Sequence, residues 1–304
     1  MRDIALSSHN AYPRKGKRFP PILPTNLRLF SYLCPVMLTF SPMIKILLLI
    51  ILLAFFLSSC GVVPLTGRRQ ILLVSDQEVL SSSLTQYKDY IKAAPKSSSA
   101  AWSAMVTRVG KNIAAATTRY LRQNGLSGEI KNFSWEFNLV KDDQVNAFCM
   151  PGGKIVVYEG LMKIISSDDE LAVVLGHEVA HAVAKHSNER MSQQMLTQYG
   201  AQILNHSLSE KNIAVQKLAG IVYGVGTQVG VMLPFSRKHE SEADYMGLIL
   251  MKMAGYNPDV AVAFWQKMAS GSTGAAPALL STHPSDAQRI RDIRKALPEI
   301  KAKY

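Results

Sequence analysis

One short stretch constrains this chain more than any other feature. The sequence LGHEVAHAVAKH places His177, Glu178 and His181 among apolar residues. Burying imidazole and carboxylate groups costs free energy unless a partner takes their polar atoms. Ser167 and Glu170 form a capping box that predicts the start of a helix, and the apolar residues that follow predict that most of its sides are covered. On such a helix the two histidines lie one turn apart on one face, where a single metal ion can bind both.

The HExxH spacing is typical of a catalytic zinc site, in which a Glu beside two His ligands activates a water. Such a site needs a third protein ligand and an open position for water. The sequence SRKHESEAD supplies candidates, because Glu240 and Asp244 lie one turn apart on an apolar helix face. We interpret Glu240 as the third ligand and Asp244 as the acceptor that fixes an imidazole tautomer. His239 and Glu242 are expected to face solvent, and the alternative is a charged surface helix without metal.

The positive charge of the chain is concentrated near its beginning. Residues 1–59 carry half of the formal net charge of +12, so the remainder has only a mild excess and no long basic run. A nucleic-acid partner is therefore not expected. The segment MIKILLLIILLAFFLSSC has a lysine, an apolar run and the ending Leu-Ser-Ser-Cys, which resembles a bacterial lipobox. We expect residues 43–59 to be a lipoprotein signal peptide and Cys60 to carry lipid; the alternative is an uncleaved anchor.

The same segment sets the expected organisation of the chain. Residues 1–42 are expected to lie outside the fold, with translation starting at Met43; the alternative is an unusually long signal. Residues 60–75 would form a tether and residues 76–304 a single metallopeptidase domain. After processing, only Cys60 and Cys149 remain, so we expect no disulfide within the chain.

The hydrophobic periodicity predicts an α+β fold that is predominantly helical. Alternation over residues 132–140, and two apolar stretches around Pro151-Gly152-Gly153, predict a small antiparallel sheet or hairpin beside the HExxH helix. The glycine-rich stretch 218–235 is interpreted as a buried helix, with a re-entrant membrane segment as the alternative. Further helices are expected near residues 76–93, 101–123, 191–208, 239–254, 258–269 and 286–296.

Four motifs in order resemble the zinc metallopeptidase family of HtpX, the CAAX prenyl proteases and the OMA-type proteases, over about residues 133–294. VNAFCMPGGKIVVYEGLM is similar to its edge-strand hairpin, LGHEVAHAVAKH to its zinc helix, SRKHESEAD to its third-ligand helix, and STHPSDAQR to a motif of its periplasmic members. The lipobox fits the lipoprotein branch. The resemblance implies one zinc per chain, bound by His177, His181 and Glu240, with Glu178 as general base. The pattern departs at Cys149-Met150, where an aliphatic pair is usual.

The resemblance implies further residue roles. His283 would reach the zinc or stabilise the oxyanion, with Arg289 six residues later as a second candidate for that stabilisation. Asn146, Ala147 and Phe148 would bind substrate by β-augmentation.

The implied activity is a zinc-dependent endopeptidase that cleaves misfolded or mislocalised cell-envelope proteins. The implied location is a bacterial envelope, lipid-anchored and facing the periplasm, with the outer membrane favoured because Gly61 follows the lipidated cysteine. An outer-membrane assembly machinery is an expected partner. The alternative function is an envelope chaperone or assembly factor with little turnover. We expect His283 to act as a latch on the zinc.

Overall fold

The computed structural model describes residues 60–209, 213–227, 233–270 and 287–304, together with the single residues Met43, Ile46, Lys211, Leu279 and His283. Residues 1–42 lie outside this description. So does the expected signal peptide, residues 43–59, except for Met43 and Ile46. The predictions for the translation start and for signal cleavage therefore stay predictions.

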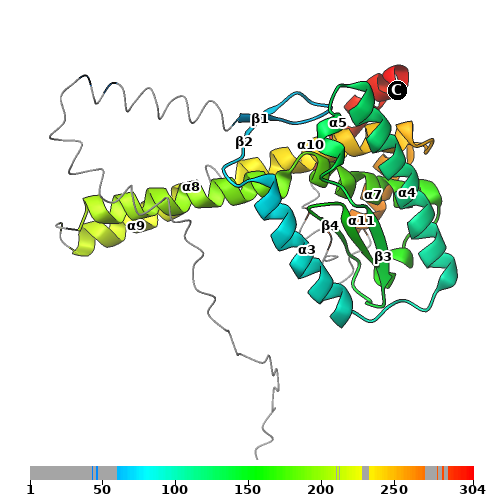
Figure 1. Ribbon diagram of the computed structural model, residues 1–304, viewed down its shortest axis with the longest axis horizontal. Coiled ribbons are helices and arrows are strands. Elements are labelled where there is room, and N and C mark those ends of the chain that lie inside the picture. The colour runs from blue at the N-terminus through cyan, green and yellow to red at the C-terminus, as the bar shows by residue number, and fades with distance from the viewer. Residues whose placement is uncertain are drawn as a thin grey trace, which may run out of the picture. The chain divides into compact units, whose positions relative to one another are not determined.

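Helices make up most of the described chain, around one small three-stranded sheet (Figure 1). The predicted fold class, helical α+β with a hairpin beside the HExxH helix, is confirmed. The strands are β1 (Cys60–Val62), β2 (Arg69–Ile71), β3 (Glu136–Val140), β4 (Ala147–Met150) and β5 (Lys154–Tyr158). The helices are α3 (Asp76–Ala93), α4 (Ala100–Gln123), α5 (Ser127–Ile130), α6 (Glu159–Met162), α7 (Asp168–Val183), α8 (His186–Ser207), α9 (Ile213–Thr227), α10 (Leu233–Met253), α11 (Val260–Ser270) and α13 (Ala287–Lys303).

Helix α7 is the central element of the core. Its N-cap Ser167 accepts a hydrogen bond from the backbone N–H of Glu170. Three acidic residues in its first turn interact favourably with the positive end of the helix dipole. It packs against α10, α4, α11 and β4. Leu171, Leu175 and Val179 are fully buried, so the helix is covered by neighbouring elements rather than by solvent.

The crossing of α7 with α10 depends on two glycines. A Cβ added at Gly247 would lie 2.8 Å from the backbone nitrogen of His177 and 2.9 Å from the carbonyl carbon of Gly176. A Cβ added at Gly176 would lie 2.8 Å from the Gly247 oxygen. The two helix backbones therefore touch, and side chains one and two turns from the crossing come within reach of the partner helix.

The sheet places a strand edge beside α7. Its order is β3-β5-β4; β5 pairs with β3 in parallel and with β4 in the antiparallel hairpin. Gly152 and Gly153 form the hairpin turn with φ values of 91° and 78°, which glycine adopts without strain. The outer edge of β4 faces the middle of α7, because the backbone N–H of Cys149 donates to a carboxylate of that helix rather than to β5.

Two segments differ from the sequence expectation. Residues 60–71, expected as a tether, form the β1–β2 hairpin and bury Val63. The glycine-rich stretch was expected to be a buried helix; within its described part, α9 instead lies beside α8 and projects away from the sheet (Figure 1), leaving Ile221 64% exposed. None of the described helices combines the length and the apolar character needed to cross a membrane.

Candidate metal centre

Three of the predicted ligand side chains converge between α7 and α10. The Nε2 atoms of His177 and His181 lie 3.0 Å apart, as expected for two histidines one turn apart that aim at one point. Glu240 on α10 brings its carboxylate oxygens to 3.2 Å from His177 Nε2 and 3.4 Å from His181 Nε2. This approach requires the close crossing at Gly247, which lies two turns from Glu240 on the same helix face.

His283, which was expected to reach the zinc, lies with these three side chains as a fourth donor. Its Nδ1 lies 3.1 Å from both oxygens of Glu240 and 3.2 Å from His177 Nε2. One atom from each of His177, His181, Glu240 and His283 falls within 4.8 Å of the others, and they form the one such donor group found among the described residues. Three imidazoles and one carboxylate suit a divalent transition metal, so this site can hold a metal ion.

Glu178 lies beside this donor group without belonging to it. The side chain is 2% exposed; its Oε2 accepts a hydrogen bond of 3.0 Å from the backbone N–H of Cys149 on β4. Its Oε1 has no hydrogen-bond partner and lies 3.4 Å from His283 Nε2. Burial raises the pKa of Glu178. One carboxylate oxygen is therefore fixed to the strand edge while the other remains available for proton transfer.

Asp244 and Arg289 lie behind His177. The Nδ1 of His177 donates to Asp244 across 2.9 Å, and Arg289 donates to both oxygens of the same carboxylate at 2.7 Å. Burial would raise the pKa of Asp244, but the Arg289 and His177 contacts outweigh it and lower that pKa. Burial alone would lower the pKa of His177, but the contacts with Asp244 and Glu240 have the larger effect and raise that pKa to about 9. The guanidinium of Arg289 also stacks over Trp265, 4.6 Å from the ring centroid.

The expectation that His239 and Glu242 face solvent is wrong. They are 1% and 8% exposed and belong to a second ionic cluster behind His181. Arg68 donates to Glu242 at 2.8 Å and to both oxygens of Glu189 at 2.8 and 2.7 Å. His239 contacts Glu189 at 2.9 Å. The physical reason is that Arg68, which comes from the β1–β2 hairpin, donates to both carboxylates, and His186 and His239 each contact one of them, which offsets the cost of removing them from water.

The second cluster contacts the donor group through His186. Its Nδ1 lies 2.9 Å from His181 Nδ1 and its Nε2 lies 2.9 Å from Glu242. Burial lowers the pKa of His186 to about 4, although the Glu242 contact opposes that shift. Burial would raise the pKa values of Glu189 and Glu242, yet hydrogen bonds from Arg68 and the histidines lower both to about 2.

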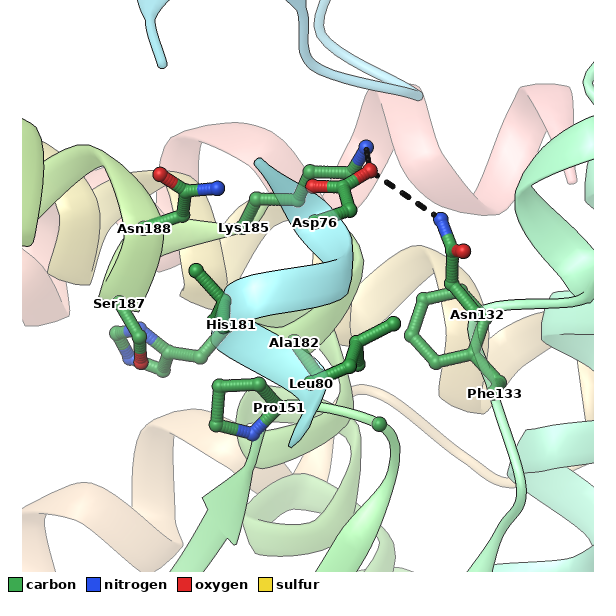
Figure 2. A pocket seen from close by; sticks show the side chains of 12 residues that line it. Asp76, Leu80, Asn132, Phe133, Pro151, His181, Ala182, Lys185, Ser187 and Asn188 are labelled. Carbon is green, nitrogen blue, oxygen red and sulfur yellow. Dashed lines mark hydrogen bonds and ion pairs between the residues drawn. The ribbon is translucent and has the colours of Figure 1, made fainter. Parts of the chain in front are cut away.

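The predicted substrate residues lie on β4 and directly before it. Asn146 precedes the strand, and its side-chain oxygen accepts from the backbone N–H of Ala147. The Phe148 ring is partly buried and packs edge-on against Tyr158 and against Tyr90 of α3. Past the end of β4, Pro151 and neighbouring apolar side chains line a pocket that His181 borders (Figure 2).

Two His ligands and an intervening Glu on one helix, with a carboxylate ligand from a second helix, define a metallopeptidase of the HExxH class. The sequence model of Peptidase family M48 matches residues 108–297, well over half of the chain, and the chain belongs to this family. The resemblance inferred from the motifs is thereby confirmed.

Curated relatives agree with the family. The chain is 39% identical over 200 residues to the Mitochondrial metalloendopeptidase OMA1 of Schizosaccharomyces pombe, which covers 65% of this chain and 54% of the relative. It is 32% identical over 174 residues to the Beta-barrel assembly-enhancing protease of Yersinia pestis, and the alignment covers 55% of this chain and 35% of that relative. It is 25% identical over 260 residues to the mitochondrial Metalloendopeptidase OMA1 of Homo sapiens, and the alignment covers 82% of this chain and 48% of that relative. The chain therefore spans about half the length of these relatives, or less.

The predicted location, lipid-anchored in a bacterial cell envelope, is wrong. Relatives named as mitochondrial, from Schizosaccharomyces pombe and Arabidopsis thaliana, match at 39% and 37% identity, above the 32% of the Yersinia pestis protease. The prediction depended on the four residues 57–60 and on Gly61. A motif of that length after an apolar run carries far less information than a match over 200 residues.

Proposed function

We propose that this chain is a zinc-dependent endopeptidase. His177, His181 and Glu240 hold one zinc ion per chain, and Glu178 is the general base. The observation that carries the proposal is the convergence of these donors beside a buried carboxylate whose Oε1 has no hydrogen-bond partner. Zinc would act there as a Lewis acid toward the scissile carbonyl and toward water.

Proton transfer is assigned to Glu178. As a carboxylate it takes a proton from the attacking water and returns it to the leaving amine. Burial raises the pKa of Glu178, which brings the group closer to the pH at which proton donation and acceptance are balanced. The hydrogen bond from the Cys149 backbone fixes the rotation of the carboxylate, so that Oε1 faces the donor group.

The substrate is proposed to bind as an extended segment along the outer edge of β4. Cys149 is on that edge, and its N–H points away from β5 toward Glu178. The backbone N–H and C=O groups of successive strand residues point alternately to the two sides of the strand. Phe148 therefore bonds with β5, while Ala147, two residues before Cys149, directs its backbone groups outward as Cys149 does. An added strand would place a peptide bond next to the general base. Asn146 contributes by holding the Ala147 N–H, which a substrate carbonyl would have to displace.

The test compares wild type with Glu178→Gln in cleavage of casein and of a fluorogenic peptide. The amide keeps the shape and the hydrogen bond from Cys149 but cannot accept a proton. Cleavage should fall by about 10²-fold or more, because a general base contributes that much. Zinc content, measured by elemental analysis, should stay at one per chain. Equal cleavage by both proteins would refute the role of Glu178.

A second candidate function is a latched chaperone or assembly factor with little turnover. It is supported by the position of His283, whose Nδ1 lies within 3.2 Å of His177 Nε2 and of both Glu240 oxygens. If His283 closes the site at rest, His283→Ala should raise casein turnover at equal zinc occupancy. If it stabilises the oxyanion, the same change should lower kcat by about 10²-fold.

We also propose the cellular context of the chain. The name of the Yersinia pestis relative refers to β-barrel assembly, which fits an assembly machinery as partner. The proposed substrates, misfolded or mislocalised proteins, stay a prediction. Arg289, the other candidate for stabilising the oxyanion, contacts Asp244 and lies 3.3 Å from Glu240, which favours a supporting role behind the ligands.

A further inference from the structure

We infer that His186 is a positioning residue for His181, and that Arg68 and Glu242 hold His186 in the required state. The inference rests on the metal site of the proposed function, since His181 is taken to be a ligand. It assigns a role to a side chain five residues after the HExxH motif and to two side chains of the second ionic cluster. Arg68 lies outside residues 108–297, the segment that matches the family.

The two ring nitrogens of His181 face different partners. Nε2 lies 3.0 Å from His177 Nε2, on the side of the donor group, and Nδ1 lies 2.9 Å from His186 Nδ1. A neutral imidazole that binds a metal through Nε2 carries its proton on Nδ1. His181 must therefore donate through Nδ1, and His186 Nδ1 must accept.

That requirement fixes His186 as well. An imidazole that accepts at Nδ1 and is neutral carries its proton on Nε2. The Nε2 of His186 lies 2.9 Å from Glu242 Oε2, and a carboxylate only accepts. One set of tautomers therefore satisfies the whole line from the metal ligand through His186 to the acid. His186 is 4% exposed and stacks on His239 with ring centroids 4.3 Å apart, so the ring has no freedom to turn.

Arg68 and Thr66 hold the Glu242 carboxylate in place. The Nε of Arg68 donates to Glu242 at 2.8 Å while its two terminal nitrogens bind both oxygens of Glu189. Thr66 donates to the other oxygen of Glu242 at 2.5 Å. The cluster holds two buried carboxylates and two histidines, but the guanidinium supplies the cation between them. Among the described residues this cluster is not a second group of converging metal donors.

The proposal predicts different zinc affinities for two variants of His186, each of which keeps an amide near the position of one ring nitrogen. His186→Asn places an amide where Nδ1 was and keeps a partner for His181 while losing contact with Glu242. His186→Gln reaches the position of Nε2 and keeps the contact with Glu242 while losing His181. Zinc affinity is measured by competition with a chelator on the purified chain, with no peptide substrate present. Thermal unfolding of the zinc-free proteins reports folding separately.

We expect His186→Gln to weaken zinc binding by about 10- to 100-fold, the usual effect of losing a partner of a ligand histidine. His186→Asn should stay within a few-fold of wild type. Arg68→Lys should weaken zinc binding in the wild-type background and add little to His186→Gln, because it acts through His186. Equal zinc affinities for the Asn and Gln variants, or the reverse order, would overturn the proposal. If the zinc-loaded wild-type protein cleaved no peptide while the variants showed the expected order of zinc affinities, the endopeptidase function would be refuted and the role of His186 would stand.

Discussion

Replacing Gly247 with alanine tests whether the helix crossing sets the metal site. The added Cβ would lie 2.8 Å from His177 N and 2.9 Å from the Gly176 carbonyl carbon, and both are backbone atoms that cannot rotate away. Carbon atoms pack at about 3.5 Å or more. The two helices must therefore separate by about 0.6 Å at the crossing. Glu240 and Asp244 lie on the same face of α10, so they move with it.

Two effects of Gly247→Ala oppose each other. Alanine favours a helix by about 1 kcal/mol over glycine. Overpacking a tight interior costs about 1–3 kcal/mol, and here both partners are backbone, which favours the upper end. The expected net loss is about 1–2 kcal/mol of unfolding free energy. Zinc sites tolerate about 0.2 Å of ligand displacement, so a separation of about 0.6 Å should weaken zinc binding well beyond the loss of stability.

The assay is urea denaturation of the zinc-free protein together with zinc affinity by chelator competition. Gly220→Ala is the matched control, because Gly220 is also in a helix but a Cβ there meets nothing within 4 Å. The control should keep wild-type zinc affinity and become slightly more stable. If Gly247→Ala resembled Gly220→Ala in both measurements, the crossing would not set the site.

Two further changes test the groups behind the ligands. Asp244→Asn should weaken zinc binding by about 10- to 100-fold, because the amide is a weaker acceptor for His177. It should also lower the unfolding free energy by about 3 kcal/mol, the lower end for a broken buried ion pair, because Glu240 stays 3.3 Å from the Arg289 guanidinium. Chelator competition and denaturation measure the two effects. Burial would raise the pKa of Glu189, but Arg68 and His239 lower it to about 2 from 4.5. Its stabilising effect is therefore present above pH 4.5 and lost as pH falls toward 2, and Glu189→Gln should flatten that part of a stability–pH profile.

Local signals predicted most of the elements that build the site. Ser75 and Glu78 form a complete capping box, and α3 begins directly after Ser75 as expected. The apolar surroundings of the HExxH motif predicted a buried helix. The spacing of Glu240 and Asp244, one turn apart, predicted a second helix that turns both acids toward the first. These features depend on residues within a few turns of each other, so the sequence carries them directly.

The second ionic cluster could not be predicted in this way. Glu242 lies off the apolar face of α10, where periodicity indicates solvent. Its partner Arg68 is 174 residues earlier, in a hairpin whose strands have three residues each and carry little pattern. Glu189 lies on α8, and no local feature of the sequence indicated an arginine beside it. The sequence did offer one signal for this cluster. His186 is a third histidine close to the HExxH motif, and a histidine there can contact a metal-binding histidine.

Helix α10 supplies one metal donor and two acids that orient the histidines of α7. Glu240 joins the donor group, and Asp244 accepts directly from His177. Glu242 reaches His181 through His186, because it lies on a different face of the helix. Each histidine therefore has one nitrogen toward the donor group and the other in a hydrogen bond that leads to a carboxylate.

These two acids pair with arginines that lie far apart in the sequence, one near each end of residues 60–304. Arg289 from α13 pairs with Asp244, and Arg68 from the β1–β2 hairpin pairs with Glu242. A buried carboxylate without its cation would be strongly destabilised, so neither end can be removed without disturbing one of the histidines. The family match, residues 108–297, includes Arg289 but not Arg68. A protein cut to that match should therefore keep the support of His177 and lose that of His181, and it should bind zinc more weakly than the chain that retains residues 60–71.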